Sequence, residues 1–110
     1  MSDPALRQRL AAILAADVAG YSRLMAGDDR ATVTALDAAR TVFRGQIEAN
    51  HGRVIDMAGD SVLAVFETAT GAVTAALAIQ AQVNALADRG PEDRRMRFSL
   101  KFLPSVVTSP

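Results

Sequence analysis

A continuous apolar run near the start of the chain most constrains the fold that this sequence can adopt. Residues 10–18 are Leu-Ala-Ala-Ile-Leu-Ala-Ala-Asp-Val, so that Asp17 is the first charged residue after the run begins, and Gly20 follows shortly after. An apolar segment without polar alternation is typical of a strand in the middle of a sheet that helices cover on at least one side. We therefore predict a central strand that ends in a carboxylate.

The same run allows a second interpretation. Arg7 and Arg9 precede it and small residues follow it, which is also the pattern of a short secretory signal peptide. The run is at the lower limit of length for such a signal and Asp17 interrupts it, so the buried strand is the favoured interpretation. It is also far too short to cross a bilayer, which needs about 20 apolar residues.

The composition is that of one small folded domain. The chain has 110 residues, of which 50% are hydrophobic and 22% are charged, and its formal net charge is zero. No basic stripe points to nucleic acid, so we expect no nucleic-acid partner. The absence of cysteine excludes disulfides and thiolate metal sites. We expect a cytoplasmic protein without a membrane segment.

Helical and hairpin patterns follow the first strand. A short helical turn is expected over residues 21–25, and a longer helix begins at the capping pair Asp28 and Asp29. This helix ends near Gly52, for which we predict the left-handed position after the helix. Two short apolar runs then flank residues 58–60, which predicts a β-hairpin with a glycine in its turn.

The remaining segments complete an α+β fold. A second helix is expected over residues 68–88 and a last strand over residues 97–103. The resulting order β-α-α-β-β-α-β predicts a ferredoxin-like sandwich. We place this domain at residues 7–103 and expect residues 104–110 to form an unstructured tail.

Two aspartates stand where predicted strands end or begin. Asp17 closes the first strand, and Asp60 lies at the hairpin tip directly before the third strand. If the third strand pairs antiparallel with the first, the two carboxylates meet at one edge of the sheet. Two carboxylates with waters and substrate phosphates suit Mg²⁺, which prefers oxygen ligands. Ordinary helix-cap and turn chemistry also explains each aspartate, and this alternative stays open.

The segment that follows Asp17 is suited to an anion. A strand that turns tightly into a helix exposes several backbone N–H groups at the helix start, and these groups can bind a triphosphate. Gly20 allows the backbone to approach a ligand closely. The turn consists of Val18, Ala19, Gly20, Tyr21 and Ser22.

Two longer motifs carry a resemblance to a known family. Residues 9–25 are RLAAILAADVAGYSRLM, and residues 51–66 are HGRVIDMAGDSVLAVF. Together with the helix that follows and the stretch PEDRRMRF at residues 91–98, they resemble the opening of the catalytic domain of class III adenylate/guanylate cyclases. The likeness covers about residues 7–100, which is the N-terminal part of that domain.

The resemblance implies a reaction, its ligands and a partner. ATP (or GTP) becomes the cyclic 3′,5′-monophosphate when its 3′-hydroxyl attacks the α-phosphorus and pyrophosphate leaves. Family sites form between two domains, so a homodimer or a heterodimer with another cyclase domain is expected. Two Mg²⁺ (or Mn²⁺) ions are implied at Asp17, Asp60 and the carbonyl of Val18. The β- and γ-phosphates are implied at the backbone of Ala19, Gly20, Tyr21 and Ser22.

Two features depart from the family pattern. Many members have a purine-reading lysine four residues before the second metal aspartate, but Asp56 occupies this position here. An ionised aspartate accepts hydrogen bonds and cannot donate one to a purine ring nitrogen, so the preference for adenine or guanine stays open. The later family segment, which supplies an asparagine and an arginine to the transition state, has no counterpart among the 110 residues. We therefore expect an incomplete cyclase domain that is inactive, or nearly so, on its own.

Two other functions remain open at this stage. The first is a non-catalytic module that dimerises with a complete cyclase and regulates it. The second is an unrelated ferredoxin-like domain that binds a small ligand or a protein.

Overall fold

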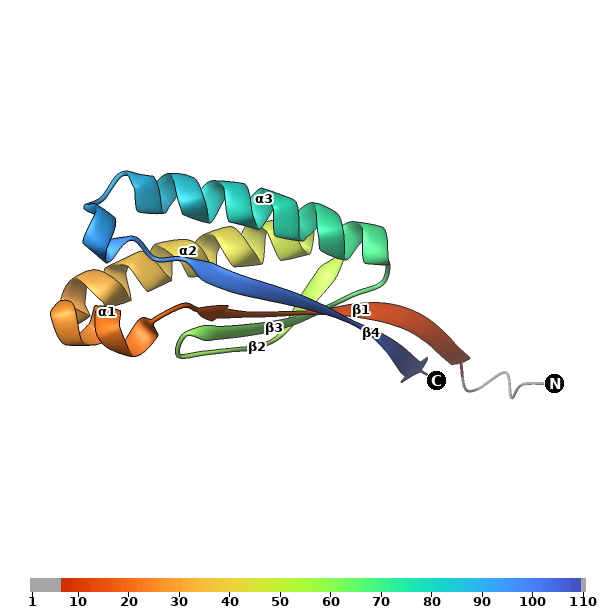
Figure 1. Ribbon diagram of the computed structural model, residues 1–110. Coiled ribbons are helices and arrows are strands. Elements are labelled where there is room, and N and C mark those ends of the chain that lie inside the picture. Colours follow the sequence, from red (N-terminus) through yellow and green to blue (C-terminus); the bar gives the residue numbers. More distant parts are fainter. Residues whose placement is uncertain (1–6, 110) are drawn as a thin grey trace.

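The computed structural model describes residues 7–109, with side chains described over residues 11–104. One antiparallel sheet has a layer of helices on one face (Figure 1). Its strands are β1 (Arg7–Val18), β2 (Gly52–Ala58), β3 (Ser61–Phe66) and β4 (Phe98–Ser109), in the order β2-β3-β1-β4. The helices are α1 (Tyr21–Gly27), α2 (Asp29–Ala49), α3 (Ala69–Asp88) and the short 3₁₀ turn η1 (Glu92–Arg94). The predicted α+β ferredoxin-like sandwich and its β-α-α-β-β-α-β order are confirmed.

The core lies between the sheet and the helix layer. Alternate residues of β1, including Leu14, point toward the helices and are buried. Phe43 of α2 is fully buried, and its ring centroid lies 5.1 Å from that of Phe98 in β4. Burial of each such large side chain contributes about 1.5–3 kcal/mol, so this layer supplies most of the stability. The largest fully buried side chains are Phe43, Phe66, Leu14, Ile47 and Ile79.

At the two ends of α2, the predicted N-terminal cap is confirmed and the predicted left-handed glycine is wrong. Asp28 caps the helix as predicted, since its side chain accepts a hydrogen bond from the amide of Ala31 at 3.0 Å. At the other end, the left-handed residue is His51, with φ of 62°, and not Gly52. Gly52 serves close packing instead, because a Cβ at this position would lie 2.5 Å from the ring of Phe66.

The predicted unstructured tail is also corrected. Strand β4 continues to Ser109 and pairs with β1 along its whole length, with Pro104 opposite Ala12 and Ser109 opposite Arg7. Pro110 lies outside the described residues. Proline has no amide hydrogen to donate, but β4 is an edge strand, where one side of the backbone has no neighbouring strand, so Pro104 does not end the pairing.

The second face of the sheet has no helix over it within residues 7–109. Side chains that point to this open face form rows across the strands, because paired residues share a face. One row consists of Asp56, Leu63, Ala15 and Lys101, and the next consists of Ala58, Ser61, Asp17 and Ser99. A bulge in β2 between Val54 and Asp56 shifts the alternation, and this shift brings Asp56 to the open face.

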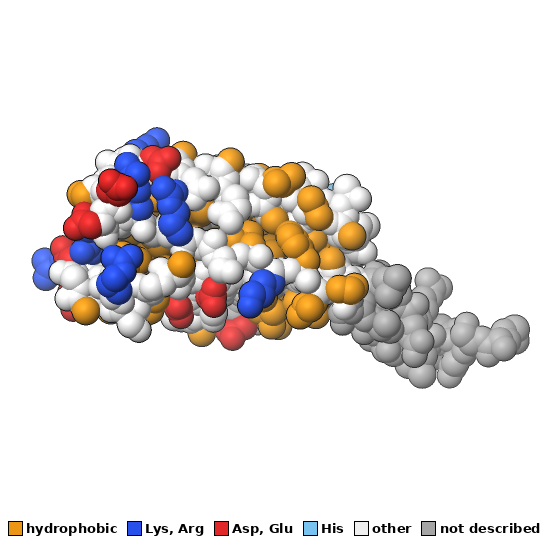
Figure 2. Space-filling view, in the orientation of Figure 1, with side chains coloured by type: hydrophobic (Ala, Val, Ile, Leu, Met, Phe, Trp, Pro, Cys, Tyr) orange, Lys and Arg blue, Asp and Glu red, His pale blue; other side chains and the backbone are white. Residues whose placement is uncertain are grey.

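Hydrophobic side chains also reach the surface on the side seen in Figure 2, where they gather over the region of α3 and β4. Exposed large hydrophobic residues of these two elements include Val73, Leu77 and Phe102. None of the described helices is long and apolar enough to cross a membrane.

Candidate metal and nucleotide site

The two predicted metal aspartates lie at the same end of the sheet. Asp17 is opposite Ser61 in the pairing of β1 with β3, and the amide of Val18 donates a hydrogen bond to the carbonyl oxygen of Asp60 at 3.2 Å. The side chain of Asp17 is exposed, and Asp60 is half-buried. Neither carboxylate takes part in the ion pairs that the described residues form. Both carboxylates are therefore available to a cation at this edge.

Three successive carbonyl groups fix the hairpin turn that contains Asp60. The Ala58 carbonyl accepts a hydrogen bond from Oγ of Ser61 at 3.0 Å, the Gly59 carbonyl accepts one from Nη2 of Arg40, and the Asp60 carbonyl accepts one from Val18. Gly59 has a φ of 56°, a left-handed conformation that glycine adopts without steric cost. The turn is thus held by β1 on one side and by α2 on the other.

The predicted phosphate-binding turn has the expected shape, but its first amide is occupied. Gly20 has a φ of 66° and α1 begins at Tyr21. The amide of Ala19 donates to the carbonyl oxygen of Arg97 at 2.8 Å and is not available to a ligand. The amides of Tyr21 and Ser22 belong to the first turn of α1, where amides have no partner within the helix.

Arg23 is a cation beside this turn that no motif in the sequence pointed to. A Cβ built on Gly20 would lie 3.6 Å from Nε of Arg23, so the guanidinium group is close to the turn. Its Nη1 donates to the carbonyl oxygen of Asp93 at 3.4 Å. On a helix, residues three positions apart lie close together, so the spacing from Gly20 to Arg23 could have revealed this residue from the sequence.

A depression of about 380 Å³ on the open face holds the predicted purine-reading position. Asp56 of β2 and Asp17 of β1 both line it, together with Leu63 on the intervening strand β3 and Ala15 on β1. Lys101 of β4 lines the same depression, although it was not predicted as a site residue. The structure therefore brings Asp56 and Asp17 to one concave surface with a cation beside them.

The donor set at this end of the sheet fits a hard cation such as Mg²⁺. The described residues contain no group of three or more His, Cys, Asp or Glu side chains that could hold an ion by themselves. Mg²⁺ commonly binds through one or two carboxylates, waters and substrate phosphates rather than through an all-protein cage. Asp17, Asp60 and the carbonyl of Val18 supply oxygen donors of this kind.

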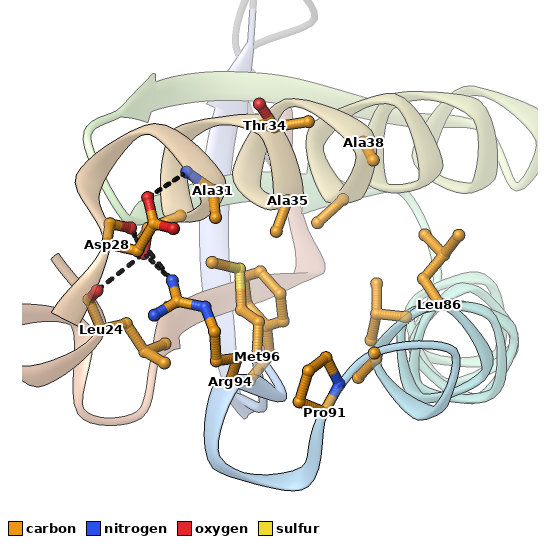
Figure 3. Close-up of a pocket in the computed structure, with 16 residues that line it drawn as sticks. Leu24, Asp28, Ala31, Thr34, Ala35, Ala38, Leu86, Pro91, Arg94 and Met96 are labelled. Atoms are coloured by element: carbon orange, nitrogen blue, oxygen red, sulfur yellow. Dashed lines mark hydrogen bonds between the residues drawn. The ribbon is translucent and has the colours of Figure 1, made fainter.

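A second cavity lies away from these residues. A groove of about 510 Å³ is bordered by α2, α3 and the segment before β4 (Figure 3). At one end of the groove, Arg94 donates to the carbonyl oxygen of Asp28 at 3.0 Å and to Oγ1 of Thr32 at 3.3 Å. Small and apolar side chains such as Ala35, Leu86 and Met96 form the rest of its walls. None of the predicted site residues lines it, so it is not part of the candidate site.

Comparison with known proteins connects this geometry to a family. No protein-family model matches the chain. Over 96 residues, or 86% of the chain, the sequence is 47% identical to the Rhizobium meliloti protein described as "Putative adenylate cyclase 3", of which it spans 16%.

Solved structures that share this fold are also described as nucleotide cyclases or cyclase-like proteins. An adenylate/guanylate cyclase/hydrolase from Silicibacter pomeroyi matches with a TM-score of 0.80 and 31% identity over 94% of this chain and 60% of that one. A class III adenylyl cyclase-like ATP-binding protein from Pseudomonas aeruginosa shares the fold, with a TM-score of 0.73 and 18% identity over 94% of this chain and 26% of that one.

The chain spans less than two thirds of the length of each of these three proteins. The matched part nevertheless includes nearly all of the described sheet and helices, and with them both aspartates. In sequence and in fold, the chain therefore matches part of the catalytic domain of the class III adenylate/guanylate cyclases.

Proposed function

We propose that this chain supplies the metal- and phosphate-binding part of a nucleotide cyclase site. The reaction would convert ATP (or GTP) to the cyclic 3′,5′-monophosphate and pyrophosphate, for cyclic-nucleotide signalling. The observation that carries the proposal is the hydrogen bond between Val18 and Asp60, which brings Asp17 and Asp60 to one edge of the sheet beside the turn at Gly20. The identity of 47% to a protein described as an adenylate cyclase supports it.

Each group at this edge has a distinct task in the proposed reaction. Asp17, Asp60 and the carbonyl of Val18 would hold two Mg²⁺ (or Mn²⁺) ions. A pair of such ions supplies charge that activates an attacking oxygen and stabilises a leaving phosphate. The amides of Tyr21 and Ser22 would bind the β- and γ-phosphates, with Gly20 leaving room for them.

Asp56 would face the base from the open face of the sheet. Its ionised carboxylate only accepts hydrogen bonds, so it would bind an amino or imino N–H of the purine. The shared depression places Asp56 on the same surface as Asp17, as a site that holds base and phosphates together requires.

A second cyclase domain is the proposed partner, either another copy of this chain or a different domain. Within residues 7–109, helices cover one face of the sheet, and the open face exposes Ile55, Leu63 and Leu103. Apolar surface of this kind commonly marks a protein–protein contact. The 110-residue chain by itself is proposed to be inactive, because it has no match for the family's transition-state asparagine and arginine. A single arginine that stabilises a phosphoryl-transfer transition state can contribute about 10³–10⁵ in rate.

A non-catalytic binding module is the second candidate function. One protein that shares the fold is described as a cyclase-like ATP-binding protein, which is compatible with this alternative. Such a module would bind nucleotide and pair with a complete cyclase without contributing a complete site of its own.

Nucleotide binding followed by complementation tests the proposal. Fluorescent ATP and GTP analogues would be titrated into the purified chain with Mg²⁺, and we expect binding that EDTA abolishes. The double variant Asp17→Asn/Asp60→Asn should lose this binding, whereas Glu67→Gln, an exposed carboxylate at the other end of the sheet, should retain it. Metal-independent binding, or equal binding by the double variant, contradicts the proposal.

Mixing experiments separate the two candidates. A complete homologous cyclase domain whose own metal aspartates have been replaced would be mixed with this chain. Recovery of cyclic nucleotide synthesis supports a catalytic contribution. A change in the activity of an unaltered cyclase domain without such recovery favours the regulatory module.

A further inference from the structure

Arg40 connects the helix layer to the hairpin turn that contains Asp60. Its Nη2 donates a hydrogen bond to the carbonyl oxygen of Gly59, and its Nη1 lies 3.4 Å from the Oδ1 of Asp37, one turn earlier in α2. The side chain is 26% exposed, so most of its length lies against the protein. Of the three hydrogen bonds that fix the turn carbonyls, this is the one that comes from a helix.

The charge of Arg40 is balanced by a residue other than the site aspartate. Asp37 forms the ion pair, and the described ion pairs do not include Asp60. Arg40 therefore fixes the backbone next to Asp60 without occupying its carboxylate, which stays available to a cation.

One donor of the Arg40 side chain has no partner among the described residues. Nε of Arg40 is buried and has no hydrogen-bond partner among the described residues. A buried donor without a partner is destabilising, and such groups need an explanation. An apolar side chain of similar length would avoid this cost, but it would lose the guanidinium donors that reach Gly59 and Asp37.

We propose that Arg40 is a positioning residue for the metal site, because it holds the Gly59–Asp60 peptide in the orientation that aims the Asp60 carboxylate at the cation. This inference rests on the proposed function. Metal sites require ligands to be held within about 0.5 Å, and a two-residue turn at the end of a hairpin has few contacts of its own to achieve this. Loss of such supporting partners typically lowers metal affinity by about 10–100-fold.

The test compares Arg40→Met with a matched arginine elsewhere. Arg40→Met keeps the apolar stem and removes every donor. Arg97→Met is the control, since the Arg97 side chain also makes two bonds, to Asn84 and Asp88 at 2.9 Å each, and does not reach the hairpin. Only the backbone carbonyl of Arg97 contacts the turn, at Ala19, and this substitution keeps that carbonyl. The Kd of a fluorescent ATP analogue would be measured for each variant over a Mg²⁺ titration, together with its melting temperature.

For Arg40→Met we expect the Mg²⁺ concentration at half-saturation to rise about tenfold while the melting temperature stays near that of the unaltered chain. For Arg97→Met we expect unchanged Mg²⁺ dependence. Arg40→Lys keeps one charged donor nitrogen without the fork and should recover part of the affinity. Amide exchange at Val18, whose acceptor is Asp60, should be faster in Arg40→Met than in Arg97→Met.

Two results overturn the inference. One is a Mg²⁺ dependence for Arg40→Met within twofold of the unaltered chain; the other is an equal loss in both arginine variants. If binding requires Asp17 and Asp60 but not Arg40, only the role of Arg40 fails. If the unaltered chain binds no nucleotide with Mg²⁺, the proposed function fails with it.

Discussion

The amide of Val18 donates a hydrogen bond to the carbonyl oxygen of Asp60 at 3.2 Å, so the last residue of β1 is tied to the residue directly before β3. This bond extends the antiparallel pairing of the two strands by one step beyond Asp17 and Ser61. The bond joins the two halves of the candidate site. Asp17 directly precedes the donor Val18, and Asp60 is the acceptor residue itself.

Ligand binding at this edge should stabilise the fold in a metal-dependent way. A non-hydrolysable ATP analogue with Mg²⁺, at about 100 times its Kd, should add about 2.7 kcal/mol to the free energy of unfolding. The measurement is a thermal melt with and without EDTA. Asp17→Asn should abolish the increase and Glu67→Gln should keep it, whereas an equal increase in Asp17→Asn would place the ligand elsewhere.

Alanine substitutions at Gly59 and at Gly45 should change the free energy of unfolding in opposite directions. Neither Gly59 nor Gly45 has a neighbour within 4 Å of a built Cβ, so substitution by alanine causes no clash. Gly59→Ala should cost about 1–2 kcal/mol because its φ of 56° disfavours a side chain. Gly45→Ala lies within α2 and should stabilise by about 0.5–1 kcal/mol. The free energy of unfolding of both variants would be measured in urea. A decrease in both would mean that α2 does not tolerate alanine at position 45.

Gly52→Ala should destabilise the protein through a clash. Its Cβ would lie 2.5 Å from the ring of Phe66 and 2.9 Å from Cγ2 of Ile47, both of which are fully buried or nearly so. Overpacking of this kind typically costs about 1–3 kcal/mol. Gly90→Ala is the matched control, since the nearest atom is at an ordinary 3.7 Å. Equal urea midpoints for the two variants would show that Phe66 can move aside.

Removal of residues 104–110 should lower stability, because residues 104–109 pair with β1. Each backbone hydrogen bond contributes about 0.5–1.5 kcal/mol net, so the deletion should cost at least about 1 kcal/mol. For a domain of this size, that is a shift of roughly 4–8 °C in melting temperature. An unchanged melting temperature would support the tail that the sequence predicted instead of the strand.

Much of the fold could be predicted because its signals are local. The apolar run of β1, the cap at Asp28 and the glycine turn at Gly59 each depend on neighbours within a few positions. The same local signals placed Asp17 and Asp60 at strand ends, and antiparallel pairing then required them to meet at one edge. The end of β4 was mispredicted because Pro104 is a strong local stop signal, and only the edge position of the strand removes its effect.

The sequence by itself determined the order of the elements, the apolar faces of the helices and the two strand ends that carry the aspartates. Only the tertiary structure decided that a bulge turns Asp56 to the open face, that the Ala19 amide is taken by Arg97, and that Arg40 reaches the hairpin turn. The spacing of residues along the chain predicts which segments are helices or strands and where a helix is capped. The partner of a backbone carbonyl or a charged side chain is set by segments far apart in sequence, which come together only when the sheet and helices pack.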